Sequence, residues 1–441
     1  MKRLLSLLLC AVLALFCATT AQAAGVSITL TASEYALHYA FDAGAQDPFV
    51  ILEYATPAEK GWMMLYSADG HFEGDVSLAY SGAGGKTSVA LTSARTTGSI
   101  GKASTTLPKA ADYQKPTGKS NAKVTDFVLT ETPEGFHYAF NAIGTDYMLL
   151  YWRSKEQTVT QPVYPDENGH YEGDVISDLT FARTQFTVQV KSGSGSMKKE
   201  ATVRKGYQAP EAPQRQEGRL SGVTVCIDAG HQENGRFVNE PIGPGLTGST
   251  SGKGGMAQGT KTNRRESIVC LEIGMLLRDE LLRQGANVVM TREDQTTFHT
   301  NIERCEIAEA GGAQIMLRLH CNNSSNHSKR GIQVYGPLNS DYAKAVADAD
   351  TYREMGQKLL DAMKTRVGMT LANSTGMVRL NDNYVGNNWA KMMCFLVEMG
   401  YLSNPAEEYL LVTPVYQQWL AEGMADGVYE IAVARGWVQA Q

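Results

Sequence analysis

Hydrophobic and polar residues follow different patterns in the two halves of the chain. In the N-terminal half, apolar and polar positions alternate over short runs such as residues 27–31 and 184–190, which predicts β-strands with one buried face. In the C-terminal half, short apolar runs alternate with longer stretches of helical spacing, of which residues 266–283 are an example. The sequence therefore predicts an all-β N-terminal part and an α/β C-terminal part.

Glycine and the apolar runs mark the ends of the predicted C-terminal elements. Gly285 follows the helical stretch and ends it, because glycine is favoured just beyond helix C-termini. Two further long helical stretches are predicted for residues 342–366 and 414–434. Short apolar runs predict strands near residues 223, 287, 314, 332, 376 and 392. Together they predict an α/β domain over residues 219–441, with a mixed sheet flanked by helices.

The N-terminal half contains an internal repeat. The His-Tyr-Ala-Phe segment 38–41 recurs at 137–140, and residues 70–76 recur with one aromatic exchange at 169–175. Both matches have an offset of 99 residues, and one shared offset for separated motifs indicates duplication. Each copy combines alternating strands with a glycine-containing hairpin turn. We therefore predict two small all-β, sandwich-like repeats, at residues 25–95 and 121–190.

Three segments are predicted to lie outside these domains. Residues 1–23 are typical of a signal peptide, with two basic residues, an apolar run and a final Ala-Gln-Ala. The apolar run is short for a membrane span, although an uncleaved anchor is the alternative. We therefore predict a secreted protein, extracellular or associated with the cell wall, with no stable membrane insertion after cleavage. Residues 96–120 and 191–218 are rich in small and polar residues and are predicted linkers.

Charge and cysteine content narrow the possible functions. The net charge is -6, which argues against nucleic acid as a partner because backbone binding needs concentrated positive charge. The cysteines beyond the signal segment are Cys226, Cys270, Cys305, Cys321 and Cys394. Their number is odd and they show no CxxC spacing, so we interpret them as small buried apolar residues rather than as a disulfide framework.

Four residues with metal-site chemistry stand at the ends of predicted elements. His231 and His320 each follow a strand, Glu398 ends a third strand, and Glu266 begins the helix. Each has an ordinary alternative; an acidic residue, for example, is favoured at a helix start by the helix dipole. Strand ends in α/β sheets share the edge where sites form. Two histidines and a glutamate can bind zinc with one position open for water, and a further glutamate can serve as the base.

Several motifs, taken in order, resemble one enzyme family. They are IDAGH (227–231), NRRESIVCLEIGMLLRDELLRQGANVVMTR (263–292), LRLHCN (317–322), GIQVYG (331–336) and FLVEMGYLSNPAEE (395–408). Over residues 219–437 the chain is similar to the zinc-dependent N-acetylmuramoyl-L-alanine amidases of the amidase-3 type. The resemblance implies an enzyme that cuts the amide bond between N-acetylmuramic acid and L-alanine of the peptidoglycan stem peptide. It also implies Zn²⁺ ligation by His231, Glu266 and His320, and a catalytic Glu398.

The segment between the first histidine and the glutamate departs from the family pattern. Residues 232–265 are longer and richer in glycine than in many members. We interpret them as a loop on the substrate groove, because long loops at sites are usually functional, and an inert insertion is the alternative. Glu233 and Glu240 in this loop are rival ligands. Glu266 ranks above them because its helix register matches the family.

The strand before His320 also departs from the pattern. Arg318 stands where a small residue is frequent, and residues i and i+2 of a strand share a face. Arg318 is therefore predicted to bind a stem-peptide carboxylate, with pairing to a structural acid as an equal alternative. Asn322 lies on the same face and is predicted to hydrogen-bond substrate. His299 and His327 lie in polar, loop-like segments and are interpreted as surface residues.

The role of the repeats is open. Their duplicated histidines at 38, 71, 137 and 170 allow a metal interpretation, but we favour strand residues inherited by duplication. The repeats are predicted either to bind cell-wall polymer, through exposed aromatic residues such as Trp62 and Trp152, or to act as spacers. Two alternatives to the amidase remain: a zinc peptidase that cuts within the stem peptide, and a catalytically inactive wall-binding protein.

Overall fold

The computed structural model describes residues 19–22, 25–96, 98–111, 113, 122–132, 135–145, 147–153, 157–176, 185–192, 195–204, 210–232, 238–250, 255–262, 264–368 and 377–440. The described chain divides into two compact units, one holding the residues up to 204 and the other those from 210 onward. Most of the predicted signal segment lies outside the described residues. Its residues 19–22 form a short strand. No helix within the described ranges is long and apolar enough to span a membrane.

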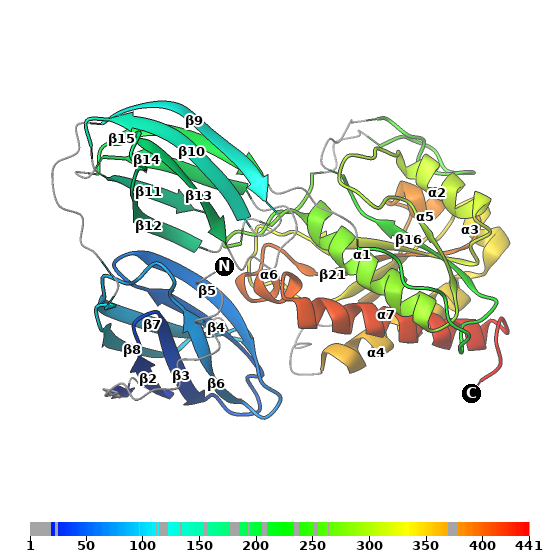
Figure 1. The fold of residues 1–441 in the computed structure, drawn as a ribbon. Coiled ribbons are helices and arrows are strands. Elements are labelled where there is room, and N and C mark those ends of the chain that lie inside the picture. Colours follow the sequence, from blue (N-terminus) through cyan, green and yellow to red (C-terminus); the bar gives the residue numbers. More distant parts are fainter. Residues whose placement is uncertain are drawn as a thin grey trace. The chain divides into compact units, whose positions relative to one another are not determined.

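The N-terminal unit consists of β-strands (Figure 1). They are β1 (Thr19–Gln22), β2 (Ser27–Ala32), β3 (Ala36–Asp42), β4 (Phe49–Ala55), β5 (Glu59–Tyr66), β6 (His71–Ser77), β7 (Gly85–Ser93), β8 (Ser99–Leu107), β9 (Lys123–Thr132), β10 (Gly135–Ile143), β11 (Met148–Arg153), β12 (Gln157–Val163), β13 (His170–Ile176), β14 (Gln185–Lys191) and β15 (Met197–Arg204). They form three sheets, with orders β1-β2-β3-β6, β13-β10-β9 and β15-β14-β11-β12-β5-β4-β7-β8. The predicted all-β character of this half is confirmed.

The eight-stranded sheet runs through both predicted repeats, which differs from two separate sandwiches. Strand β5 of the first repeat pairs with β12 of the second, and the Thr160 N–H donates to the Ala58 carbonyl over 2.7 Å. Each half nevertheless has its own hydrophobic core, one centred on residues 28–107 and the other on residues 122–190. The two halves therefore share a backbone ladder and have separate cores, and Tyr80 of the first half packs edge-on against Trp152 of the second.

Strands also occur inside both predicted linkers. Residues 99–107 form β8, in which every second residue is buried although most of them are small. Small residues in a strand look like linker composition, because burial of a glycine, alanine or threonine leaves little trace in hydrophobicity. Residues 197–204 form β15, an edge strand with Lys198 and Lys199 exposed, as charged edges usually are.

Trp152 does not have the exposed position expected of it. Its side chain is 0% exposed and packs edge-on against Phe136 and Phe186 in the core of the second half. Trp62 on β5 is only partly buried. The apolar alternation of β11 explains the difference, since Trp152 shares a face with Leu150 and Met148, which are also fully buried.

The C-terminal unit is an α/β domain with a six-stranded mixed sheet, as predicted. Its elements are β16 (Thr224–Ala229), α1 (Glu266–Arg283), β17 (Asn287–Met290), α2 (Asn301–Ala310), β18 (Ile315–Asn322), β19 (Gln333–Gly336), α3 (Asp341–Val346), α4 (Ala349–Val367), β20 (Met377–Leu380), α5 (Val385–Trp389), β21 (Met393–Tyr401), α6 (Pro405–Leu411) and α7 (Pro414–Ala434). The strand order is β17-β16-β18-β21-β19-β20, and only the β19–β21 pairing is antiparallel among these neighbours. Helices α1, α4 and α7 lie on one side of the sheet, and α2, α3 and α5 lie on the other (Figure 1).

The long helical stretch predicted for residues 342–366 is two helices. Ala347 adopts an extended conformation between α3 and α4. The Asp348 side chain then accepts a hydrogen bond from the Thr351 N–H over 2.8 Å and caps the second helix. Aspartate is a preferred N-cap because its carboxylate satisfies a free N–H of the first turn. The helical periodicity continues across the break, so the pattern alone did not reveal it.

Candidate metal centre

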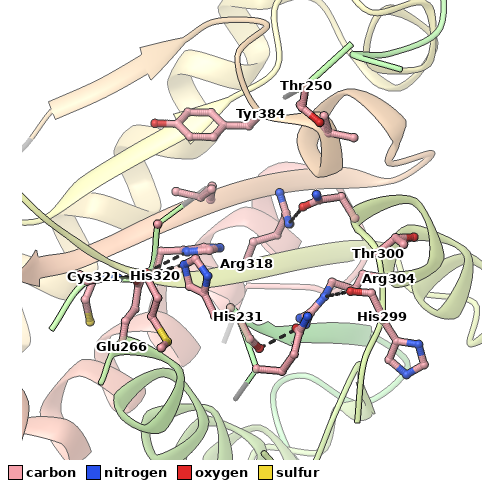
Figure 2. Close-up of a pocket in the computed structure, with 18 of the residues that line it drawn as sticks. His231, Thr250, Glu266, His299, Thr300, Arg304, Arg318, His320, Cys321 and Tyr384 are labelled. Carbon is pink, nitrogen blue, oxygen red and sulfur yellow. Dashed lines mark hydrogen bonds and ion pairs between the residues drawn. The ribbon is translucent and has the colours of Figure 1, made fainter. Parts of the chain in front are cut away.

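Parallel strand pairing brings the four predicted site residues together. Strands β16, β18 and β21 are neighbours, so their carboxyl ends lie at one edge of the sheet. His231 follows β16, and His320 lies in register with Glu398 across β18 and β21. Glu266 is the first residue of α1. All four residues line one cavity of about 930 Å³. Figure 2 is a close-up of this cavity with residues of its wall drawn as sticks.

Three of these side chains form a compact ligand set. The Glu266 Oε2 atom lies 3.1 Å from the His231 Nε2 atom, and its Oε1 atom lies 3.0 Å from the His320 Nδ1 atom. One ligand atom from each residue falls within 4.8 Å of those of the other two. Figure 2 shows the two rings and the carboxylate side by side. Two imidazoles and a carboxylate in this arrangement can hold one divalent metal ion.

His231 is presented by a strained turn. Its φ of 57° lies in the left-handed region, which costs a non-glycine residue about 1–2 kcal/mol. Gly230 before it allows the chain to pass β18 closely, since a Cβ there would lie 2.4 Å from the Leu319 carbonyl oxygen. Arg304 donates to the Ala229 carbonyl over 2.9 Å and to the His231 carbonyl over 3.2 Å. Buried hydrogen bonds therefore hold the turn in its unfavourable conformation.

The Glu266 carboxylate is fixed and ionised. It is 3% exposed and accepts hydrogen bonds from the backbone N–H groups of Ala257, over 2.7 Å, and Cys321, over 3.0 Å. Burial alone would raise the pKa of Glu266, but hydrogen bonds with His231 and His320 hold it well below its usual range. Burial lowers the pKa of His320, which favours the neutral imidazole that metals bind.

Glu398 has the opposite electrostatic character. Burial, and secondly the negative charge of Glu266, raise the pKa of Glu398 to about 8. Its Oε2 atom is buried with no hydrogen-bond partner among the described residues, and the same is true of the His320 Nε2 atom. Unsatisfied buried polar atoms are rare and need a cause. A cation bound between these side chains would satisfy both atoms, so the residues present fit a metal ion.

Arg318 forms the pairing with a structural acid that the sequence allowed as one of two roles. Its Nε atom donates to the Asp228 Oδ2 atom over 2.9 Å, and its Nη2 atom donates to the Asn301 Oδ1 atom over 2.7 Å. Asp228 is 0% exposed and also accepts from Arg304 and, over 2.7 Å, from the Thr291 hydroxyl. Burial opposes ionisation, yet the charges of Arg304 and Arg318 hold the pKa of Asp228 well below its usual range. Arg318 borders the cavity as part of a buried ion pair.

Asn322 lies at the cavity on the predicted side of β18. It is partly exposed, and its Nδ2 atom donates to the Gln333 Oε1 atom over 3.1 Å. Its carboxamide oxygen accepts only from the neighbouring Asn323 N–H in the described contacts.

The long loop contributes to the cavity, and its Glu240 carboxylate is hydrogen-bonded to the start of α2. The Glu240 carboxylate accepts from the Asn301 N–H, the Asn301 Nδ2 atom and the Ile302 N–H, over 3.2, 2.7 and 2.8 Å. It thereby neutralises the start of α2, where carboxylates are favoured. The loop residues Val238, Thr250 and 255–257 line the cavity. Glu233 lies outside the described residues.

Three residues of this region, His299, Arg292 and Arg304, were missed or misplaced from the sequence, whereas His327 is at the surface as predicted. His299, predicted to be a surface residue, is partly buried and lines the cavity. His327 is exposed, and its Nδ1 atom lies 2.6 Å from the Ser403 carbonyl oxygen. The buried Arg292 and Arg304 were not singled out at all. A charged residue directly after an apolar strand, as Arg292 is, was the available signal.

Comparison with known proteins assigns the C-terminal unit to a family. Residues 225–430 match the Amidase_3 model, described as N-acetylmuramoyl-L-alanine amidase. The germination-specific N-acetylmuramoyl-L-alanine amidase of Bacillus subtilis is 26% identical over 231 residues, covering 49% of this chain and 83% of that protein. The probable cell wall amidase LytH of Staphylococcus aureus is 27% identical over 218 residues, but this chain spans only 60% of its length. The family resemblance seen in the sequence is confirmed for this domain.

Solved structures are also similar to about half of the chain. An N-acetylmuramoyl-L-alanine amidase from Clostridium difficile 630 is 24% identical with a TM-score of 0.38, covering 48% of this chain and 96% of that one. The catalytic domain of CwlV from Bacillus (Paenibacillus) polymyxa is 24% identical with a TM-score of 0.35, covering 49% and 99%.

Removal of the buried negative charge is predicted to destabilise the C-terminal unit. Asp228→Asn leaves Arg304 and Arg318 buried without a carboxylate, which costs about 3–5 kcal/mol. Because the folded-state pKa lies below the unfolded value of about 3.9, this contribution is fully present above that pH and is lost as the pH falls further. Thermal unfolding at pH 7 should show a melting temperature lower by roughly 6–20 °C.

The control is Asp279→Asn, which replaces a half-buried carboxylate paired with Arg278 and should cost at most about 1 kcal/mol. Equal shifts in the two variants would contradict the role of Asp228.

Proposed function

We propose that this chain, whose residues 225–430 form an Amidase_3 domain, is a zinc-dependent peptidoglycan hydrolase. It would cleave the amide bond between N-acetylmuramic acid and the L-alanine of the stem peptide. The observation that carries the proposal is the convergence of His231, Glu266 and His320 beside the half-buried Glu398. A ligand set with an adjacent acid–base group is the minimum that metal-assisted amide hydrolysis requires.

His231, Glu266 and His320 would hold the zinc ion. A bound zinc ion supplies a Lewis acid and lowers the pKa of water at this point. The chain's own contribution is to keep the three ligands fixed before the ion arrives. The N–H groups of Ala257 and Cys321 orient the Glu266 carboxylate, and burial keeps His320 neutral. Such outer partners fix the orientation of metal ligands.

Glu398 would carry the proton between the two halves of the reaction. A carboxyl group with a pKa near the working pH can accept a proton and also release it. Glu398 would accept a proton from the attacking water and donate it to the nitrogen of the departing L-alanine. The pKa of about 8 without a metal reflects burial and the Glu266 charge, and a nearby cation would lower it. The products are a free lactyl carboxylate on the glycan and a free α-amine on the peptide.

Substrate contacts are proposed for the polar cavity wall. The partly exposed Asn322 could hydrogen-bond the peptide or glycan, since its carboxamide oxygen can accept a further donor. Arg318 is a weaker candidate for direct contact, because its Nε and Nη2 atoms donate to Asp228 and Asn301. The loop residues Val238 and Thr250 complete the cavity on another side.

The N-terminal unit is proposed to be a duplicated accessory module of a secreted protein. Strand pairs β3–β6 and β10–β13 have the same register, with His38 opposite Asp75 and His137 opposite Asp174. This equivalence supports duplication. The module would bind cell-wall polymer or act as a spacer. Aromatic side chains suited to stacking on sugar rings are exposed at Tyr35, Tyr66 and Tyr164.

Metal content discriminates between the rival ligands. Glu266→Ala should lose zinc, because it removes the central oxygen ligand, with affinity falling by at least ~100-fold. Glu240→Ala should retain zinc, because its carboxylate serves the start of α2. Zinc per chain after dialysis, measured by elemental analysis, checks both. Zinc loss only in the Glu240 variant would reverse the assignment.

The reaction itself is tested by digestion of purified peptidoglycan. Mass spectrometry should find free L-alanine amines on released peptides and glycan chains left intact. New ends within the stem peptide would instead indicate the zinc peptidase. The absence of any product would indicate the inactive binding protein. Glu398→Gln should retain zinc but lose activity by ~10²–10⁴-fold.

The matched control for that variant is Glu407→Gln. Glu407 is a buried carboxyl group on α6 whose pKa burial raises to about 7, but it does not line the cavity. It should keep most of the activity. Near-normal turnover of Glu398→Gln would remove Glu398 from the mechanism.

Wall binding by the N-terminal module is tested by sedimentation. Residues 25–205 should pellet with insoluble cell-wall material if the exposed tyrosines contact polymer. Replacement of Tyr66 and Tyr164 by serine should then reduce the pelleted fraction, whereas replacement of the buried Trp152 would act only through misfolding. A module that stays in the supernatant would leave only the spacer role.

A further inference from the structure

Arg292 is a buried cation that donates only to backbone carbonyls. It is 2% exposed and directly follows the short strand β17 and Thr291. Its Nε atom donates to the Ala229 carbonyl over 2.7 Å, and its Nη1 atom donates to the Asp294 carbonyl over 2.8 Å. Its Nη2 atom donates to two carbonyls, those of Gly230 over 2.8 Å and Ser267 over 2.7 Å. No ion pair among the described residues includes Arg292.

The two carbonyls that share one nitrogen flank two of the candidate ligands. Gly230 directly precedes His231, and Ser267 directly follows Glu266. A single guanidinium group therefore bridges the turn after β16 and the first turn of α1. These two backbone segments are connected in sequence only through the long loop. Arg292 connects them beside His231 and Glu266, through the carbonyls of Gly230 and Ser267.

Burial of this guanidinium group costs desolvation free energy, which indicates that its contacts are functionally important. A buried guanidinium without a carboxylate pays desolvation that carbonyl dipoles only partly offset. Burial, and secondly the charge of Arg304, lower the pKa of Arg292 to about 10. The group still remains charged at neutral pH. The rigid planar fork of arginine suits several simultaneous acceptors better than the single nitrogen of lysine.

The bridged backbones need external support. The His231 backbone is in the left-handed region, with a φ of 57°. Helix α1 has no side-chain cap at its start, where Arg265 occupies the N-cap position. Gln295 adds a second donor to the Ser267 carbonyl, over 2.9 Å, from the same segment as Arg292. The segment after β17 is therefore attached to both backbones that carry these ligands.

Arg304 does not duplicate this bridge. It donates to the Ala229 and His231 carbonyls and to the Gln232 side chain, and it is paired with Asp228. None of its described contacts reaches α1. Arg304 thus supports the His231 turn alone, whereas Arg292 connects that turn to the helix.

We propose that Arg292 is a positioning residue of the metal centre, which sets the separation of His231 and Glu266 by binding the carbonyls of Gly230 and Ser267. The inference rests on the proposed function, in which these residues ligate zinc. Arg292 does not line the cavity and touches no substrate. It acts through the spacing of two ligands, whose facing atoms are 3.1 Å apart.

The test measures zinc affinity of the full-length chain rather than activity. Arg292→Met removes every donor, and Arg292→Lys retains the charge but not the fork. The matched control is Arg278→Met, which removes another buried arginine, on α1, whose Nη2 atom donates to the Pro210 carbonyl over 2.9 Å. Zinc dissociation constants come from competition with a chromogenic chelator at pH 7. The melting temperature of each zinc-free protein reports the cost to the fold.

The positioning role predicts a loss of affinity separate from any loss of stability. Arg292→Met should bind zinc ~10–100-fold more weakly, which is the usual loss when a residue that orients a metal ligand is replaced. The zinc affinity of Arg292→Lys should lie between those of Arg292→Met and the wild type. Arg278→Met should keep the wild-type affinity while the melting temperature of its zinc-free form falls. If Arg292→Met does not fold, the lysine variant carries the test.

Two results would overturn the inference, and they are distinguishable. Zinc affinity of the Arg292 variants equal to that of Arg278→Met would mean that Arg292 is structural only, with the proposed metal centre intact. A wild-type chain that binds no zinc would remove the proposed function and this inference with it.

Discussion

The parallel pairing of β16, β18 and β21 is the constraint on which the site depends. Three strands that run side by side in one direction must end at one edge, so residues 231, 320 and 398, far apart in sequence, become neighbours there. The fourth residue, Glu266, comes to the same edge because α1 returns along the sheet and starts beside these strand ends. The apolar side chains that make these strands buried thus also determine where the polar chemistry gathers. Change in the register of any one strand would move its terminal side chain to the wrong face or the wrong height.

Behind the turn that carries His231, the buried Asp228 lies among the buried arginines Arg292, Arg304 and Arg318. Asp228 neutralises Arg304 and Arg318 together, while Arg292 is surrounded by carbonyl oxygens. These groups lie behind the turn that carries His231, where they keep a left-handed backbone in place. Glu266 and Glu398 lie on the cavity side and differ sharply in electrostatic character. Hydrogen bonds from two imidazoles keep Glu266 ionised, whereas Glu398 has no such partner in the described part of the chain and its pKa rises to about 8. One carboxylate is thereby suited to holding a cation and the other to exchanging a proton.

The sequence predicted most of the elements and the convergence of His231, Glu266, His320 and Glu398 at one cavity, because strand ends and helix starts can be read from short-range pattern. It did not predict interactions that depend on distant partners. Arg318 lines the cavity as expected, but only the fold reveals that its Nε atom donates to Asp228 over 2.9 Å. The hydrogen bonds of the Glu240 carboxylate to the start of α2 could likewise not be read from the sequence. In the N-terminal unit, the duplicated motifs indicated two similar halves, but nothing local specified that β5 and β12 would join them into one sheet. Strand β8 was hidden because its buried residues are small.

The central claim is that a metal ion binds to two imidazoles and a carboxylate at this edge, and X-ray absorption at the zinc edge tests it directly. The fine structure of the zinc-loaded chain should fit nitrogen and oxygen neighbours at about 2.0–2.2 Å, with two imidazole signatures. Sulfur should be absent from the first shell, because burial raises the pKa of the Cys321 thiol, the cysteine adjacent to His320, well above its ordinary value. A sulfur neighbour at about 2.3 Å, or a shell without imidazole, would contradict the account.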